Sequence, residues 1–339
     1  MFIFSKAFKG LFIFPLLFLI QVVCPTASYA QPRWVLVDTG FGRLPEGLRL
    51  YRSEEQLNGK PFKAYYVEAD LKNRGLQFST DTSRNRRLKP SEFFEKAGRP
   101  WLVVNTSFFS FQTNRNLNLI INRNNILSYN IHSVRARGHD SILFSHPLVS
   151  ALGISRNRTA DIAWTFTDSS LNRVYASQLP ITAPRDSFAQ LTKNRAKKYT
   201  TAVTNNNRKK QLRKWRMQTA VGGGPVLIQR GNIQITNNEE MKFSGKAILD
   251  AHPRTGIGYT PDGKLIILVV EGRNPGVAEG ATLEQLALIF QQLGCVEAMN
   301  LDGGGSTSML INGKETIRPS DKGEQRAIPG VLMIQKAEK

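Results

Sequence analysis

Cysteine and histidine are scarce in this chain of 339 residues, which contains 2 cysteines and 4 histidines without any cluster of the two types. Cys24 lies in the N-terminal apolar segment, so Cys295 is left alone in the remainder and can form no internal disulfide. We interpret Cys295 as a small buried hydrophobic residue. The fold must therefore depend on its apolar core. We expect no metal site, because zinc sites are built from clustered Cys and His ligands, and we expect no cofactor.

Long apolar runs are also rare, and only the run from Leu11 to Val23 stands out. Lys6 and Lys9 precede this run, and small residues at Ser28 and Ala30 follow it, which is typical of a secretory signal peptide over residues 1–30. An uncleaved anchor is the alternative, but the run is short for a membrane span. We expect residues 31–339 to form a secreted or periplasmic domain with no stable membrane insertion after cleavage.

Acidic residues are few, because 26 Asp and Glu stand against 46 Lys and Arg, for a net charge of +20. Such a balance informs about partners rather than fold. The chain lacks a recognisable nucleic-acid-binding motif, so nucleic acid is not the expected partner. The expected partners are anionic polysaccharides, phosphodiester-linked polymers or membrane surfaces. An alternative is a basic surface without a specific partner. The segment 185–216 is especially basic, and we interpret it as an exposed, mobile excursion from a single domain. The oligomeric state is not indicated.

Short apolar runs separated by turn residues predict a mixed, sheet-rich α+β domain with few helices. A capping box of Thr282 and Gln285, with Gly294 as the stop, predicts a helix over 282–293. A second, short helix is expected after Ser91, which we take as its cap. The clearest predicted strands cover 48–51, 64–67, 76–78, 101–104, 226–228, 265–271 and 296–301.

The order of strand 265–271, helix 282–293 and strand 296–301 predicts a β-α-β crossover. The two strands should then run parallel in one sheet, with their carboxyl ends at the same edge. Glu271 and Asp302 lie at these two ends. We therefore expect two carboxylates that are distant in the sequence to meet at an edge where α/β sheets commonly bind ligands.

A glycine-rich turn follows Asp302, and a similar turn precedes the strand at 226–228. Glycines expose backbone N–H groups to a ligand, and arginine side chains bind phosphate oxygens in pairs. Alternatively, the carboxylates and arginines form structural salt bridges, and Asp302 only caps its turn. The predicted substrate and phosphate contacts are Arg254, Thr255, Arg273, Arg326, Asn105, Gly303, Gly304, Gly305, Ser306, Gly223 and Gly224.

Three motifs carry a resemblance to the phosphodiester glycosidase family: Asn-Leu-Asp-Gly-Gly-Gly-Ser at 300–306, His-Pro-Arg-Thr-Gly-Ile-Gly at 252–258, and Gly-Gly-Gly-Pro at 222–225. The resemblance extends from about residue 101 onward, without support over 112–216. It implies hydrolysis of a sugar-1-phosphodiester at the sugar–oxygen bond, with release of free sugar and a phosphomonoester. Asp302 and Glu271 would then act at the anomeric carbon. One of the two residues would be the nucleophile or base, and the other would be the acid or electrostatic partner. The resemblance leaves open which residue takes which role.

Three positions depart from the family pattern. Thr106 and Ser107 stand where the family has two glycines, and Glu271 stands where it has aspartate. We expect Thr106 and Ser107, which are bulkier than glycine, to narrow the pocket and change the sugar that fits. We expect the Glu271 side chain, which is longer than that of aspartate, to reach further into the site. The alternative function is a non-catalytic binding protein for anionic cell-surface polysaccharide or exopolysaccharide.

Overall fold

The structure is a computed structural model that describes residues 32–136, 140–202 and 212–338. The predicted signal peptide therefore lies outside the described residues. Within the described residues, no helix is both long enough and apolar enough to cross a membrane.

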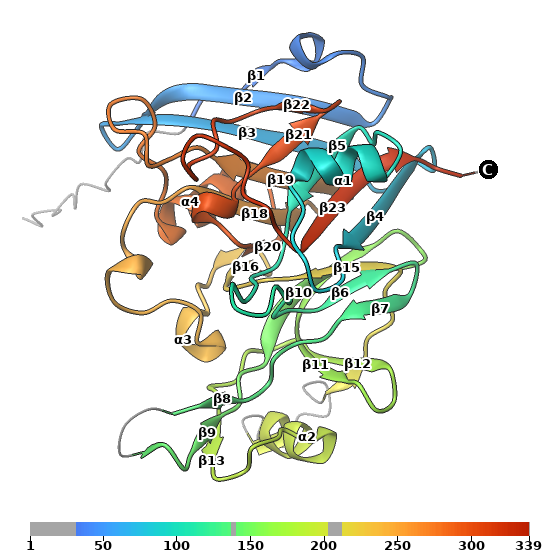
Figure 1. Ribbon diagram of the computed structural model, residues 1–339, viewed down its shortest axis with the longest axis vertical. Coiled ribbons are helices and arrows are strands. Elements are labelled where there is room, and N and C mark those ends of the chain that lie inside the picture. The colour runs from blue at the N-terminus through green and yellow to red at the C-terminus, as the bar shows by residue number, and fades with distance from the viewer. Residues whose placement is uncertain (1–31, 137–139, 203–211, 339) are drawn as a thin grey trace, which may run out of the picture.

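The described chain folds into four sheets and four α-helices, which confirms the sheet-rich α+β prediction (Figure 1). The first sheet has the order β1 (Val35–Leu36), β2 (Leu48–Leu57), β3 (Lys60–Asp70), β19 (Lys264–Val270), β18 (Arg254–Tyr259), β20 (Glu297–Asn300), β16 (Val226–Gln229) and β17 (Asn232–Ile233). The second sheet has the order β22 (Lys314–Glu315), β21 (Met309–Ile311), β5 (Leu102–Asn105), β23 (Gly330–Lys336) and β4 (Leu76–Thr82).

A third sheet carries the middle of the chain, in the order β14 (Arg213–Lys214), β12 (Arg173–Ser177), β11 (Ala160–Asp168), β10 (Val149–Ile154), β15 (Thr219–Gly222), β6 (Ile120–Asn122) and β7 (Asn125–Ser128). The fourth consists of β13 (Arg185–Asp186), β9 (Phe144–Ser145) and β8 (Val134–Arg135). The helices are α1 (Pro90–Lys96), α2 (Lys193–Ala202), α3 (Asn237–Glu240) and α4 (Leu283–Gln292).

The predicted parallel strands β19 and β20 do run in the same direction in one sheet, but β18 lies between them. β18 pairs antiparallel with β19 on one side and with β20 on the other. Arg254 at the start of β18 lies opposite Val270, and Gly256 lies opposite Asn300. The carboxyl ends of β19 and β20 therefore share an edge with the amino end of β18, which brings the 252–258 motif to that edge.

Helix α4 has the predicted capping box, in which the Gln285 N–H donates to Thr282 Oγ1 at 3.1 Å and the Thr282 N–H donates to Gln285 Oε1 at 2.9 Å. It packs on the sheet through an apolar face that includes Phe290. Gly256 makes room for this packing, since a Cβ there would lie 2.6 Å from Phe290 Cε2. Helix α1 begins at Pro90, so the prediction that Ser91 caps it was wrong. Proline fits a first helical position because its φ is already helical.

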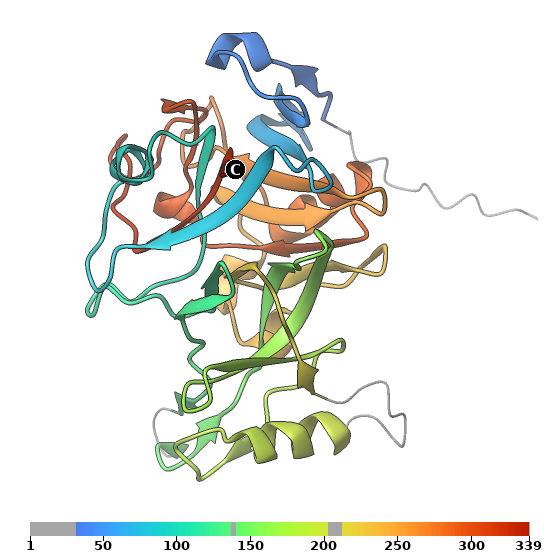
Figure 2. The ribbon, with the colours of Figure 1, turned by 90° about the vertical axis from the view of Figure 1, so that its right-hand side faces the viewer.

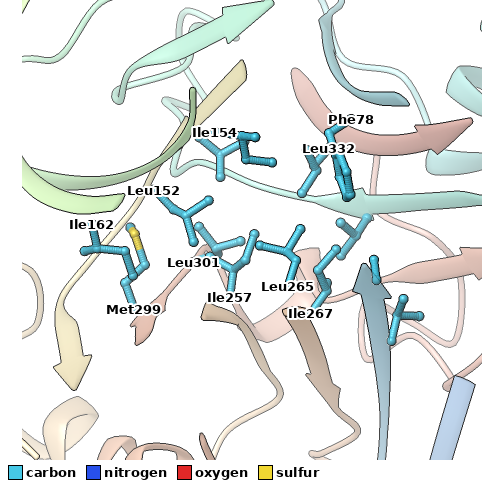
Figure 3. Close-up of a cluster of buried hydrophobic side chains, with 14 of the residues drawn as sticks. Phe78, Leu152, Ile154, Ile162, Ile257, Leu265, Ile267, Met299, Leu301 and Leu332 are labelled. Atoms are coloured by element: carbon cyan, nitrogen blue, oxygen red, sulfur yellow. The ribbon is translucent and has the colours of Figure 1, made fainter. Parts of the chain in front are cut away.

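One buried apolar core joins the first three sheets (Figure 3). It includes Leu152 of β10, Ile257 of β18, Leu265 of β19 and Leu332 of β23, all 1% exposed or less. Because each sheet contributes one of its faces to this core, the three sheets are held at fixed positions relative to one another.

The fourth sheet and α2 form a lobe at the opposite end of the molecule from β1 and β2 (Figures 1 and 2). This lobe holds much of the basic segment 185–216. The described residues of that segment are not simply an exposed excursion, because they form β13, α2 and β14, and Trp215 is buried. Residues 203–211 of the excursion lie outside the described residues.

Candidate active site

Asp302 follows β20 and is pinned to the second sheet by its backbone. Its N–H donates to the Thr106 carbonyl at 2.8 Å, and its carbonyl accepts from Asn105 Nδ2 at 2.6 Å. The Gly303 N–H donates to Asp302 Oδ1 at 3.0 Å. The carboxyl group is thus fixed where the first and second sheets meet.

Asn105 and Thr255 lie behind this turn and support it. Thr255 Oγ1 donates to Asn105 Oδ1 at 2.8 Å, and the same oxygen accepts from the Ser308 N–H at 3.1 Å. Both Asn105 and Thr255 are buried. Their side chains connect β5, β18 and the Asp302 turn, while direct contact with substrate stays a prediction.

The Asp302 carboxyl is partly accessible to solvent but lies in a dense protein environment. Burial raises the pKa of Asp302 to about 6, against the lowering effects of the Ser306 hydroxyl, Arg326, the Gly303 N–H and Lys242. Such a group is mostly ionised at neutral pH yet can exchange protons near that pH, which is a property of general acids and bases.

Lys242 lies beside Asp302 and was missed in the sequence analysis. Burial lowers the pKa of Lys242 to about 8, whereas Glu240 and Asp302 raise it. Its Nζ lies 5.0 Å from the centre of the Phe108 ring. Gly224 permits this approach, since a Cβ there would lie 2.7 Å from Lys242 Cε. No sequence signal marked this lysine, because it follows the four-residue helix α3 in a region without a motif.

Glu240 of α3 anchors the segment that carries Lys242. It is 1% exposed. Its carboxylate accepts hydrogen bonds from the Ser150 N–H and hydroxyl, from Trp164 Nε1, from the Val226 N–H and from Thr236 Oγ1, at 2.7–3.2 Å. These donors come from the first and third sheets, so Glu240 holds them together next to the site.

Arg254 and Arg273 bring two guanidinium groups close to one another at the edge of the sheet. Arg254 is 3% exposed. Its Nε and Nη2 donate to the carbonyls of Ala281 and Asp250 at 2.9 and 3.1 Å. Burial, and then the charge of Arg273, lower the pKa of Arg254 to about 10. Among the described residues, neither arginine has a carboxylate oxygen within 4.0 Å.

Arg273 and Arg326 lie against the glycine turn that follows Asp302. A Cβ on Gly304 would lie 3.0 Å from Arg273 Nη2, and a Cβ on Gly305 would lie 2.1 Å from Arg326 Nη2. Arg326 also donates from Nε to Asp321 at 2.8 Å and from Nη1 to Ser306 Oγ at 3.4 Å. The two glycines therefore let the cationic groups reach the backbone of the turn.

Several of the glycine N–H groups predicted to bind phosphate are already engaged inside the protein. The Gly304 N–H donates to the Pro253 carbonyl at 2.8 Å, and those of Gly223 and Gly224 donate to the carbonyls of Ser150 and Asn300 at 3.0 and 2.7 Å. Gly223 and Gly303 instead allow close packing of the backbone. Among the described residues, the cations of the site without a carboxylate oxygen within 4.0 Å are Arg254, Arg273 and Lys242.

Glu271 lies at the same sheet edge as Asp302, at the end of β19, but its carboxylate is held by other partners. Oε2 accepts from the Arg318 N–H at 3.0 Å and lies 3.6 Å from Lys63 Nζ. Oε1 accepts from Asn274 Nδ2 at 3.4 Å, and the residue is 1% exposed. Glu271 thus forms a salt bridge with Lys63 and not with an arginine as the alternative had it, and a catalytic role of Glu271 stays a prediction.

The adjacent Phe108 and Phe109 have different surroundings. Phe109 is buried among apolar residues that include Phe93. Phe108 packs edge-to-face on Phe243, with ring centres 5.8 Å apart. The Arg254 guanidinium lies 5.7 Å from the centre of the Phe243 ring. Phe108 and Phe243 thus form an apolar wall beside the cations.

Comparison with known proteins bears on this arrangement. The family model described as phosphodiester glycosidase matches residues 99–335, which is more than half of the chain. This chain belongs to the phosphodiester glycosidase family. The match includes the 112–216 region, where the sequence motifs carried no resemblance.

Individual proteins match this chain over shorter stretches. The chain is 40% identical over 83 residues to the SPbeta prophage-derived uncharacterized protein YomE of Bacillus subtilis strain 168, covering 24% of this chain and 13% of that protein. It is 31% identical over 103 residues to the N-acetylglucosamine-1-phosphodiester alpha-N-acetylglucosaminidase of Mus musculus, covering 28% and 20%. The matches thus span a fifth or less of each relative's length.

The fold is similar to that of the zebrafish N-acetylglucosamine-1-phosphodiester alpha-N-acetylglucosaminidase catalytic domain, which was solved in a form auto-inhibited by its pro-peptide. The TM-score is 0.52 at 19% identity, and the alignment covers 91% of this chain and 89% of that chain. At this identity the likeness concerns the fold alone.

Thr106 and Ser107, two of the three departures from the family pattern, have different surroundings in the structure. Ser107 Oγ donates to Asn116 Oδ1 at 3.1 Å. Thr106 Oγ1 is buried without a hydrogen-bond partner among the described residues. Because a buried hydroxyl normally has a partner, Thr106 is a candidate contact for a polar group of a ligand.

Proposed function

We propose that this protein is a secreted hydrolase that cleaves the sugar–oxygen bond of a sugar-1-phosphodiester and releases free sugar and a phosphomonoester. The observation that carries the proposal is the pair of guanidinium groups of Arg254, which is 3% exposed, and Arg273, which is exposed and lies against Gly304 in the turn of Asp302. Among the described residues, neither has a carboxylate oxygen within 4.0 Å, whereas a buried charge such as that of Arg254 is normally paired. An anionic ligand such as a phosphodiester would supply the missing partner.

In the proposed reaction, the bond between the anomeric carbon and the phosphate oxygen breaks, and the oxygen leaves with the electron pair on the phosphate. Arg254, Arg273 and Arg326 bind this negative charge. A phosphate ester leaves as a stable anion, so the demand for a proton donor is lower than in ordinary glycoside hydrolysis. Water supplies the hydroxyl group of the free sugar, and its remaining proton passes to solvent or to the phosphomonoester.

Asp302, ionised at neutral pH, acts at the anomeric carbon as nucleophile or as base toward water. Its raised pKa suits either role. Lys242 provides a positive charge near Asp302 and, with a pKa of about 8, can also transfer a proton. Glu271 remains a second carboxylate at this edge. A separation of about 5 Å between acting carboxyl groups favours retention of configuration, and a wider one favours inversion.

The sugar is part of the proposal and is not fixed by the site. The names of the mammalian relatives support a sugar of the N-acetylglucosamine type as the first to be tried. Thr106 and Ser107, in place of the two glycines of the family pattern, favour a sugar of different shape, because they add side-chain atoms directly after Asn105.

The test is hydrolysis of a panel of α-sugar-1-phosphodiesters, including nucleotide sugars, in water enriched in ¹⁸O. The proposal expects reducing sugar with the label in the sugar, whereas label in the phosphomonoester would mean cleavage at phosphorus and would contradict it. Asp302→Asn should abolish turnover. Asp262→Asn, in the turn at the opposite end of β18 and β19, should retain it. Binding without any release of sugar would favour the non-catalytic alternative.

A further inference from the structure

A second group of cations lies on the third sheet, away from Asp302. A cavity of about 300 Å³ opens there between the β6–β7 hairpin, the start of β12, and the end of β14 with the residues that follow it. We call it the β12–β14 cavity. Its lining includes three exposed cations and three amide side chains: Arg173, Lys214, Arg216, Asn124, Asn125 and Asn172.

The three cations have no ion-pair partner within the described part of the chain. The acidic residues of the same sheet, Asp161 and Asp168, lie near the cavity, but their carboxylates accept hydrogen bonds from other groups and form no ion pair with the three cations among the described residues. Asp161 accepts hydrogen bonds from Trp215 Nε1 at 2.5 Å and from Gln178 Nε2 at 2.9 Å. Asp168 accepts from the hydroxyl and the N–H of Ser170 in its own turn. The cavity therefore has an excess of positive charge.

The inner side of the β12–β14 cavity is rigidly built. Trp215 is buried, and its backbone N–H donates to the Val174 carbonyl at 2.9 Å. Gly153 allows this segment to lie flat on the sheet, since a Cβ there would lie 2.4 Å from Met217 Cγ. A site formed in advance loses less entropy when a ligand binds.

Helix α2 lies at the end of the molecule (Figures 1 and 2) and adds further cations near β12 and β14. Lys193 of α2 lies 4.6 Å above the ring of Tyr175, and Tyr175 pairs with Lys214 between β12 and β14. Lys197 and Lys198 of α2 are exposed. The cations therefore form a track rather than a single point.

The β12–β14 cavity and the Asp302 site lie at opposite ends of β15. The cavity borders Met217, just before the strand, while Gly224, just after it, is hydrogen-bonded to Asn300 near Asp302. The seven residue steps from Met217 to Gly224 span up to roughly 23 Å of extended chain. One small sugar phosphate cannot contact both places, whereas an extended polymer can.

We propose that the β12–β14 cavity is a secondary binding site for a glycan whose sugar units are joined by phosphodiesters, and that it holds this polymer while a sugar-1-phosphodiester linkage is cleaved at Asp302. This proposal rests on the proposed function. Cations and amides match the phosphate and hydroxyl groups of such a chain. Single-stranded nucleic acid is disfavoured, because its bases stack on accessible aromatic rings, and Trp215, the aromatic residue of the cavity lining, is buried.

The test compares the protein with a variant in which Arg173, Lys214 and Arg216 are all replaced by glutamine. A matched control replaces three exposed cations near β2 and β3, namely Arg43, Lys60 and Lys72, also by glutamine. The Asp302→Asn background allows binding to be measured without turnover. The probes are a purified phosphodiester-linked glycan, oligo(dT) and, for hydrolysis in the active background, a small soluble sugar-1-phosphodiester.

The variant with Arg173, Lys214 and Arg216 replaced should bind the glycan about tenfold more weakly. Its binding should also depend less on salt. For three lost phosphate contacts, the slope of log K against log salt concentration should be shallower by up to about 2. KM for the glycan should rise while kinetics on the small diester stay unchanged. The control should bind as the unaltered protein does. Equal loss in both variants, or tighter binding of oligo(dT) than of glycan, would overturn the proposal. Absence of hydrolysis of any small diester would instead refute the proposed function, and the binding comparison would still decide the role of the cavity.

Discussion

Replacing Asp302 with asparagine should stabilise the protein at neutral pH while it abolishes activity. The pKa of Asp302 is raised from its ordinary value of 3.8 to about 6, chiefly by burial. The unfolded chain therefore gives up this proton at a lower pH than the folded protein does. As the pH rises from about 4 to 6, ionisation of Asp302 makes folding less favourable, and above about 6 the cost stays constant. Asparagine does not ionise and avoids this cost.

The size of the effect follows from the pKa difference. One pH unit corresponds to 1.36 kcal/mol, so a difference of about 2 corresponds to about 3 kcal/mol at pH 7 and above. Asparagine can still accept the Gly303 N–H through its carbonyl oxygen, so most of the gain is retained. We expect an increase of about 2 to 3 kcal/mol in the free energy of unfolding. For a domain of this size that corresponds to a rise in Tm of roughly 3–5 °C.

The assay is thermal unfolding of both proteins from pH 4 to pH 8. The Tm difference should be near zero at pH 4, grow up to about pH 6 and then remain level. Asp262→Asn is the control with the opposite sign, because the Thr260 hydroxyl lowers the pKa of Asp262. An Asp302→Asn protein that is no more stable than the unaltered one at pH 8, or whose advantage is largest at pH 4, would refute the reasoning.

Three further predictions concern the neighbours of Asp302. Gly305→Ala puts a Cβ 2.1 Å from Nη2 of Arg326, so kcat/KM should fall about tenfold or more. The control is Gly40→Ala, because the new Cβ there has no atom within 4 Å. This control should leave kcat/KM unchanged in the same assay. Glu240→Gln leaves at least one of five buried donors without an acceptor and should lower the free energy of unfolding by about 1–3 kcal/mol. An unchanged urea midpoint would contradict this. Inorganic phosphate at ten times its Kd should stabilise the protein by about 1.4 kcal/mol and raise its Tm. Arg254→Gln should remove this rise in Tm. An equal rise in both proteins would count against a phosphate site at Arg254.

Local elements of the fold were predictable because their signals are short-range. The capping box of α4 and the hairpin at Asn312–Gly313 are examples. Asn312 and Gly313 have φ values of 49° and 79°, which is the conformation that favours this residue pair in two-residue hairpins. The direction of β19 and β20 was also predictable, because the helix between them implies a crossover.

The position of β18 was not predictable in the same way. β18 precedes β19 along the chain and also pairs with β20, and no local pattern distinguishes a strand with one neighbour from a strand with two. Its insertion explains why Arg254 lies at the same edge as Asp302. In the sequence, Arg254 and Asp302 are linked only by the motifs at 252–258 and 300–306.

Lys242 and Glu240 were missed for a related reason. Neither belongs to a recognised motif, and both act through contacts with residues distant in the sequence. Glu240 accepts hydrogen bonds from Ser150, Trp164 and Val226. Such a carboxylate looks like an ordinary helix residue in the sequence, since its partners become neighbours only in the folded protein.

The backbone around Asp302 has a consequence for how activity is acquired. The turn is hydrogen-bonded to Thr106 and Pro253, and Arg326 closes it from the other side. We therefore expect no separate fragment of the chain to contain a complete active site. Two separately expressed halves should each be inert, and catalytic competence should emerge only when the halves reassociate.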